Sequence, residues 1–410
     1  MRILKTMTFD INAVVVGAIT RGLSDYKNQL SAKPEQADKL KLQHASILKT
    51  IGESFGYDHI QEEAVQLLLE LFPTFERWGY WSDCITISKE ALSLDLSPEQ
   101  QGYLNANLGR IYLLNRNFDD SLRHLNQSLA LADKHQLKNL SGLTHHRLMN
   151  TYLLCEDHTT AKQHGLQALS YLSKEPSETL AAAYNSLGLA SMGLNKLTEA
   201  ENYFWDALAI WDCLKDYTHM ARSYQNLGVL FFQQGNLEEA KKCFENALVT
   251  LGNTSSIVDR LKAMNGLGSV YHSLGDFATA ENVFTDATAK WENELGDKIG
   301  WYHLRGSLTH NLGNTQLAKG NPVQARVTLE RATTFWQQAN DDLQKGNTVG
   351  TIAEAFMEDE EWEAAVVTYD DALALLEKFP DHPWARKLAN DFQQARGECA
   401  ERLNSPEEGE

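Results

Sequence analysis

Six histidines fall within about forty residues and are the first candidates for chemistry in this sequence. They are His124, His135, His145, His146, His158 and His164. A zinc site needs several ligands on one helical face, three or four residues apart, usually with carboxylate or Cys ligands beside them. His145 and His146 are adjacent, so their side chains point about 100° apart around a helix. We therefore predict no metal site and interpret these histidines as surface or groove residues.

Other signatures of catalysis are missing. The sequence has no glycine-rich phosphate loop, His-Glu-x-x-His, Gly-x-Ser-x-Gly or EF-hand loop. Its five cysteines are scattered, without a Cys-x-x-Cys pair, and several fall at apolar helix positions, which favours buried thiols in a reducing, cytoplasmic compartment. They are Cys84, Cys155, Cys213, Cys243 and Cys399. We predict that the protein is not an enzyme and binds no cofactor.

Composition narrows the classes of partner. The formal net charge of −18 argues against binding to a nucleic-acid backbone, which needs a surplus of Lys and Arg on some face. No segment approaches the roughly 20 apolar residues of a membrane span. The apolar run 13–19 is preceded by Asp10 and Asn12, and we interpret it as part of a first helix rather than a signal peptide.

A Leu-Gly pair, or a close stand-in, returns seven times at intervals of 37, 40, 39, 40, 40, 45 and 40 residues. The pairs are Leu71-Phe72, Leu108-Gly109, Leu148-Met149, Leu187-Gly188, Leu227-Gly228, Leu267-Gly268, Leu312-Gly313 and Ile352-Ala353. Such a period predicts a stacked-repeat protein, in which each repeat buries its apolar face against its neighbours. A solenoid of this kind offers a long groove rather than a pocket for catalysis.

Each repeat reads as two antiparallel helices. Small residues recur thirteen residues after the Leu, as at Ala240, and a large residue follows four positions later, as at Phe244. These offsets place both on one helical stripe, where small residues allow close helix packing. Trp211, Trp291 and Trp336 recur near the end of the second helix, and we predict that they pack in the core.

The turns and the ends of the chain carry further signals. Glycine is predicted to end the first helix of a repeat, and Asn or Asp to cap the second, with Glu239 completing a capping box at Asn236. The predicted caps are Asn117, Asp157, Asn236, Asp276 and Asn321, with Pro322 at the first helical position. Helices are also expected at 12–30, 34–52 and 383–403, and a kink at Pro73.

These repeats resemble the tetratricopeptide repeat over roughly residues 60–376. The run Tyr224…Leu227-Gly228…Phe231…Ala240…Phe244…Ala247 fits that family's signature at each anchor, while the spacing near 40 is similar to its long-helix variety. The resemblance implies an all-α fold, a right-handed α-solenoid of antiparallel helix hairpins with helical caps. The expected parts are an N-terminal helical cap (1–58), an array of one degenerate and seven full repeats (59–376), a C-terminal capping helix (377–403) and an acidic flexible tail (404–410).

The resemblance also implies that the first helices line a concave groove, through offsets −5, −2, −1, +2 and +5 from each Leu. Between Tyr103 and Leu317 these offsets contain no carboxylate, and Glu354 is the first. The residues predicted to bind a peptide there are Tyr103, Asn107, Arg110, His146, Arg147, Asn150, Asn185, Arg222, Gln225, Asn226, Lys262, Asn265, His272, His310, Asn311 and Asn314. Asn side chains pair with peptide main chain, and Arg and Lys attract carboxylates. Similarity to the carboxylate clamp of chaperone-binding members is partial, because His146 replaces a Lys and Ser186 an Asn.

The predicted function is non-enzymatic: a scaffold or adaptor that holds a protein or peptide segment of acidic or C-terminal carboxylate character in the groove. A solvated polar helix face without a ligand remains open as the simpler interpretation. A second functional alternative is a regulatory sensor that binds a signal peptide or effector and switches a partner protein. Neither nucleic acid nor membrane is an expected partner, and a homodimer through an end of the array is compatible with this interpretation.

Overall fold

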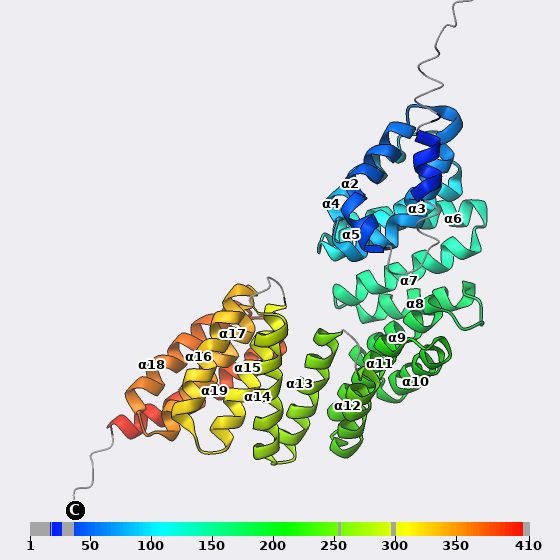
Figure 1. Ribbon diagram of the computed structural model, residues 1–410. Helices are drawn as coiled ribbons and strands as arrows, with labels where there is room; N and C mark the ends of the chain where they lie inside the picture. Colours follow the sequence, from blue (N-terminus) through cyan, green and yellow to red (C-terminus); the bar gives the residue numbers. More distant parts are fainter. Residues whose placement is uncertain (1–16, 18, 27–36, 253–255, 297–300, 405–410) are drawn as a thin grey trace, which may run out of the picture. The chain divides into compact units, whose positions relative to one another are not determined.

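The computed structural model describes residues 17, 19–26, 37–252, 256–296 and 301–404, and all regular elements in these ranges are α-helices (Figure 1). The chain forms two compact units, Met1–Tyr203 and Phe204–Glu410. The helices before the seven full repeats are α2 (Ala37–Ser54), α3 (Asp58–Trp78) and α4 (Trp81–Ala91). The first unit continues with α5 (Pro98–Leu114), α6 (Phe118–His135), α7 (Lys138–Leu154), α8 (His158–Tyr171) and α9 (Glu178–Gly193). The unit boundary falls within α10 (Leu197–Leu214).

The second unit continues the same alternation. Its helices are α11 (Tyr217–Gln233), α12 (Leu237–Leu251), α13 (Ile257–Ser273), α14 (Phe277–Glu294), α15 (Tyr302–Ala318), α16 (Pro322–Gln338), α17 (Asp342–Glu358), α18 (Trp362–Leu376) and α19 (Pro383–Asn404). We call the odd-numbered helices from α5 to α17 the first helices and the even-numbered helices from α6 to α18 the second helices. Within each unit a first helix packs on the second helix that follows it, and that second helix packs on the next first helix. The predicted all-α solenoid is confirmed.

The first helices form the inner layer of each unit. In the first unit α5 packs directly on α7 and α7 on α9, and in the second unit α11, α13, α15 and α17 follow one another in the same way, with α19 next to α17. Among the described residues no two second helices pack to the same extent. A stack whose one layer is more closely spaced curves toward that layer, so the first helices present the inner face of each unit.

Small residues allow this close packing. A Cβ atom on Gly109 would lie 2.5 Å from Cγ of Leu125, and one on Gly268 would lie 2.6 Å from the ring of Phe284. The recurring alanines of the second helices are fully buried, as at Ala240. Trp211, Trp291 and Trp336 retain only 3%, 2% and 4% of their surface, which confirms their predicted place in the core.

Between the first and second helices the same left-handed turn recurs. Gly235, Gly275 and Gly320 adopt it with φ of 74°, 79° and 81°, as predicted for residues that end a helix. Arg116, Glu156, Asn195 and Glu360 adopt it without being glycine, with φ between 56° and 60°. The backbone conformation is therefore a property of the repeat and is imposed even where the residue type opposes it.

Glu360→Gly is expected to stabilise the second unit by about 0.5–1 kcal/mol, because glycine carries no steric penalty at a φ of 60°. Gly320→Ala makes the reverse change at the equivalent turn, where φ is 81° and an added Cβ would meet no other atom. It should lower the free energy of unfolding by about 1 kcal/mol. Urea denaturation of both variants measures the two changes. Equal stabilities would show that these turns are not strained.

The predicted caps are confirmed at three of five positions. The side chains of Asn117, Asp157 and Asp276 accept hydrogen bonds from the backbone N–H three residues on. Asn236 and Asn321 make no such bond, so the predicted capping box at Asn236 is wrong. There Glu239 accepts from Lys242 instead, at 2.6 Å, and turns away from the cap.

The ends of the chain agree in part with expectation. The C-terminal helix is α19, as predicted. Residues 19–26 and α2 are helical, whereas the rest of the helix expected at 12–30 and the tail 405–410 lie outside the described residues. Helix α3 runs through Pro73 to Trp78. No helix in the described ranges is both long and apolar enough to cross a membrane.

Candidate functional site

The sixteen residues predicted to bind a peptide all lie on first helices. In the first unit they occupy α5, α7 and α9, and in the second unit α11, α13 and α15. Only Arg222 and Lys262 are exposed, while Asn107 and Gln225 are buried and the other twelve are half-buried. The sequence therefore places them on the inner-layer helices, but most of them already contact other side chains.

In the first unit these contacts bridge consecutive helices. Arg110 on α5 donates from Nε to both carboxylate oxygens of Glu76 on α3, at 2.8 and 2.7 Å. Arg147 on α7 donates from Nη1 to Oδ1 of Asn107 on α5, at 2.9 Å. The next bridge runs from Oγ of Ser186 on α9 to Oδ1 of Asn150 on α7, at 2.8 Å. The inner face thus carries a ladder of polar side chains that ties each first helix to the next.

The second unit has the same ladder with different members. Arg222 donates from Nε and Nη2 to the two carboxylate oxygens of Asp259, both at 2.9 Å, and Gln225 donates to the main-chain oxygen of Asp259. Asn311 donates to Oδ1 of Asn265 at 3.0 Å. Nδ1 of His272 lies 3.1 Å from Oγ1 of Thr315 and adds a second contact between α13 and α15. Nδ1 of His310 lies 3.0 Å from Oγ1 of Thr348 and joins α15 to α17.

Asp259 corrects the expectation of an inner face without negative charge. Asp259 lies eight residues before Leu267, one helical turn beyond the offset of −5 at which the predicted stripe begins. Its side chain is only 3% exposed. Burial acts to raise the pKa of Asp259, but hydrogen bonds from Arg222 and Ser256 outweigh it and hold that pKa below its usual range. Extending the stripe by one helical turn would have found this partner. Arg222 is therefore already neutralised in the protein.

Arg147 differs from the other arginines of the ladder. Arg110 and Arg222 each face a carboxylate, whereas Arg147 pairs with none among the described residues and donates only to the neutral amide of Asn107. Desolvation and the nearby Arg110 guanidinium lower the pKa of Arg147. Desolvation, together with Arg110 and Arg147, lowers the pKa of His146 to about 4. We call Arg110, His146 and Arg147 the Arg147 patch, a half-buried cluster with a positive charge in excess.

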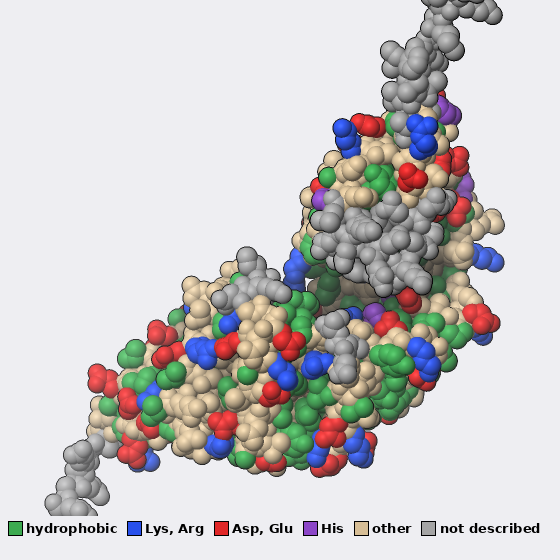
Figure 2. Space-filling model, in the orientation of Figure 1, with side chains coloured by type: hydrophobic (Ala, Val, Ile, Leu, Met, Phe, Trp, Pro, Cys, Tyr) green, Lys and Arg blue, Asp and Glu red, His purple; other side chains and the backbone are tan. Residues whose placement is uncertain are grey.

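Charge elsewhere is mixed. On the surface seen in Figure 2, acidic side chains are interspersed with Lys and Arg rather than gathered into one region. At the far end of the second unit's inner face, desolvation and the carboxylates of Asp391 and Glu358 raise the pKa of Glu354. At the offsets used for the inner face, the first carboxylate is thus Glu354 on α17.

The histidine cluster is more buried than predicted. His124 and His145 retain 6% and 9% of their surface, so their interpretation as surface or groove residues is wrong. Nδ1 of His145 lies 2.9 Å from Nδ1 of His164, and the ring of His145 stacks on Tyr171 and that of His164 on Tyr152. Sequence spacing could not reveal this pair, because its members come from α7 and α8. No set of three metal-ligating side chains occurs among the described residues.

The cysteines divide into two groups. Cys84, Cys243 and Cys399 are buried thiols, as predicted from their apolar helix positions, whereas Cys155 and Cys213 are exposed. Burial, with Asp83 and Glu76 nearby, raises the pKa of Cys84 to about 12, so this thiol is not a nucleophile.

Comparisons with known proteins agree with the repeat fold. Models of the tetratricopeptide repeat family match residues 178–249, 260–298 and 306–331. Among solved structures, the apo form of RapI is similar with a TM-score of 0.58 at 12% identity, covering 83% of this chain and 98% of that one. A Rap protein complexed with Competence and Sporulation Factor has a TM-score of 0.56 at 15% identity, covering 88% and 98%.

A third similar structure is the apo form of the quorum sensor NprR from B. thuringiensis, with a TM-score of 0.56 at 16% identity, covering 86% of this chain and 99% of that one. At these identities the likeness concerns the fold. No curated protein matches the sequence.

Proposed function

This chain is a tetratricopeptide repeat protein, and we propose that it is a non-catalytic binding protein that holds a segment of another protein or a peptide along the inner face of its first helices. The bound segment has acidic character or ends in a carboxylate near the Arg147 patch. The observation that carries the proposal is that Arg147 has no ion-pair partner of its own among the described residues, because Glu76, whose charge also acts on Arg147, is bound by Arg110.

The physical argument rests on what a half-buried guanidinium costs. Removing a charged group from water is unfavourable unless an opposite charge or several hydrogen bonds replace the lost hydration. Arg110 has Glu76 for this purpose, but Arg147 has only Asn107. The carboxylate of a bound segment would supply the opposite charge that Arg147 lacks, and it would accept hydrogen bonds from the remaining N–H groups of Arg147. Neutral His146 beside it adds no repulsion toward a ligand's own donors.

Charge reversal at this position tests the proposal. Peptides are first selected from a phage-displayed random 12-residue library on the full chain, and their affinities are then measured by isothermal titration calorimetry. Arg147→Glu is expected to weaken binding of the selected acidic peptides at least tenfold, and raised salt should weaken it further. Arg123→Glu is the matched control, because Arg123 pairs with Asp120 on the second helix α6, away from the inner face.

The outcomes are distinct. Peptides rich in Asp and Glu that lose affinity in Arg147→Glu and keep it in Arg123→Glu support the proposal. Selected peptides rich in Lys and Arg, or an affinity that does not change in Arg147→Glu, contradict the acidic specificity. If no peptide is enriched at all, peptide binding itself is contradicted.

The polar ladder favours a second candidate, a sensor whose binding changes its own packing. Each ladder bond joins side chains about 34–46 residues apart, on neighbouring helices of the inner layer that are separated in the chain by one other helix. A ligand carboxylate that takes Nη1 of Arg147 from Asn107 removes one of these bridges, and so couples binding to the packing of α5 on α7. Small-angle scattering of the chain with and without a selected peptide tests this, since a passive adaptor keeps its scattering profile.

A further inference from the structure

One repeat of the second unit is longer than the others. The interval from Leu267 to Leu312 is 45 residues, whereas the next interval, from Leu312 to Ile352, is 40. The additional residues fall between the end of α14 at Glu294 and the start of α15 at Tyr302. Trp301 is the last residue before α15, so the longer connection delivers this side chain to the beginning of an inner-layer helix.

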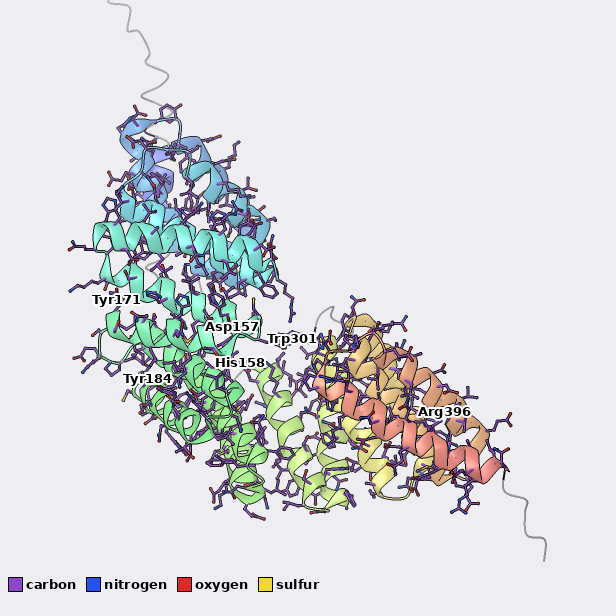
Figure 3. All side chains as sticks on the ribbon, turned by 180° about the vertical axis from the view of Figure 1, so that it is seen from behind. Asp157, His158, Tyr171, Tyr184, Trp301 and Arg396 are labelled. Atoms are coloured by element: carbon purple, nitrogen blue, oxygen red, sulfur yellow. The ribbon has the colours of Figure 1, made fainter. Side chains whose placement is uncertain are left out.

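Trp301 is held in a conformation that its residue type disfavours. Its φ of 64° lies in the left-handed region, where a bulky side chain is a genuine outlier. The side chain does not recover this cost by burial, since it is 53% exposed and lies at the edge of the unit (Figure 3). Among the described residues its indole N–H has no hydrogen-bond partner. The free protein therefore gains little from a tryptophan here.

The indole ring of Trp301 lies against Lys262. Its ammonium lies 5.2 Å from the centre of the Trp301 ring, and Lys262 is one of the two exposed members of the predicted binding set on α13. One face of the indole thus covers an inner-face cation, in the manner of a cation–π contact. Lys262 forms no ion pair among the described residues; Asp259 on the same helix is paired with Arg222, and the Lys262 charge only helps to lower the pKa of Asp259.

We propose that Trp301 and Lys262 form a subsite for an apolar or aromatic side chain of a segment bound along the inner face of the second unit, next to an acidic group of that segment. The proposal rests on the proposed function and adds a determinant of specificity in the second unit. The ring provides flat apolar surface for the side chain, and the indole N–H and the Lys262 ammonium provide donors for the adjacent carboxylate or carbonyl. A cationic side chain is disfavoured at this place by Lys262.

The variants separate recognition from folding. Trp301→Asn removes the ring and places a residue that tolerates the left-handed conformation, so the melting temperature is expected to stay equal or rise by about 2 °C. Trp301→Phe keeps an apolar face but lacks the N–H. Trp205→Ala is the control for loss of an exposed tryptophan, because Trp205 is 42% exposed on the second helix α10.

The probes are peptides selected from a phage-displayed random 12-residue library on the full chain, synthesised and titrated by calorimetry. We expect an apolar residue beside Asp or Glu in them, and about a tenfold loss of affinity in Trp301→Asn with a smaller loss in Trp301→Phe and none in Trp205→Ala. Replacing the peptide's apolar residue by Ala should cost little further affinity in Trp301→Asn, as a double-mutant cycle requires for a direct contact.

Two results would overturn the inference in different ways. If some of the selected peptides lose affinity in Arg147→Glu but none loses affinity in Trp301→Asn, the subsite is removed and the proposed function stands. Peptides indifferent to both substitutions, or the absence of any enriched peptide, would contradict the subsite together with the proposed function.

Discussion

Phe392→Ala is expected to lower the free energy of unfolding of the second unit by about 3–4 kcal/mol. Phe392 lies on α19 and is only 4% exposed, and its ring packs against Tyr369 of α18 with centroids 5.8 Å apart. It also fills the place left by Gly350 on α17, where a Cβ would lie 2.0 Å from the ring. Gly350 has no side chain that could move into the space, so the cavity cannot collapse easily.

This substitution tests whether α19 closes the stack. The end of a solenoid leaves an apolar face that must be covered by a polar-faced cap. Helix α19 buries Ala385, Phe392 and Cys399 and exposes a polar outer side, and so it has the properties of such a cap. Loss of Phe392 should therefore loosen α17 as well, including the acidic end of the inner face at Glu354.

Urea denaturation of the full chain measures the effect. Lys387→Ala is the matched control on the same helix, because Lys387 is exposed and its loss should change stability by less than about 0.5 kcal/mol. A cost below about 1 kcal/mol for Phe392→Ala would mean that α19 contributes little to the second unit and that the stack ends at α18.

The fold could be predicted because its signal is repeated. The Leu-Gly spacing fixes where each hairpin begins, and glycine, alanine and a large residue recur at positions that require close packing, as Gly268 and Phe284 show. Errors in one repeat are corrected by the others. The caps at Asn236 and Asn321 failed because a single side chain has other partners available, and periodicity says nothing about which one it takes.

The sequence could predict which side chains line the inner face of the first helices, but not which partner each of them contacts. Helical offsets say which side chains point inward, but the partner of each lies about forty residues away on the next helix, and no local pattern identifies it. Asp259 illustrates this, since its carboxylate holds Arg222 from just outside the stripe that the offsets define. Trp301 was missed for a different reason, because an insertion lies outside any repeat pattern and its residue type alone indicates neither exposure nor φ.

Lowering the pH from 7.5 to 5.0 is expected to destabilise the protein by several kcal/mol, through histidines that the fold holds neutral. Desolvation lowers the pKa of His310 to about 4, and desolvation with Arg110 and Arg147 does the same for His146. Desolvation also lowers the pKa of His145 and His164. In the unfolded chain these groups return to a pKa of about 6.5 and take up protons that the folded state does not bind.

The sign follows from this difference in bound protons. A histidine whose folded pKa is lowered contributes stability that is fully present above about pH 6.5 and is lost as the pH falls toward the folded value near 4. At pH 5.0 such a group can cost up to about 2 kcal/mol, and partial exposure reduces this to roughly 1–2 kcal/mol for His310. The His145–His164 hydrogen bond adds to the loss, because two protonated rings have no acceptor nitrogen between them.

His310→Asn isolates one contribution. Asn cannot titrate here but can still reach toward Thr348 on the neighbouring first helix, so the variant should lose stability at pH 7.5 and show a shallower fall toward pH 5.0. His135→Asn is the control, since His135 is exposed in the last turn of α6. Urea denaturation at half-unit steps between pH 7.5 and 4.5 gives the slopes. A slope in His310→Asn as steep as that of the unaltered chain would mean that His310 has the same pKa in the folded and the unfolded protein, and so that the fold does not disfavour its protonated form.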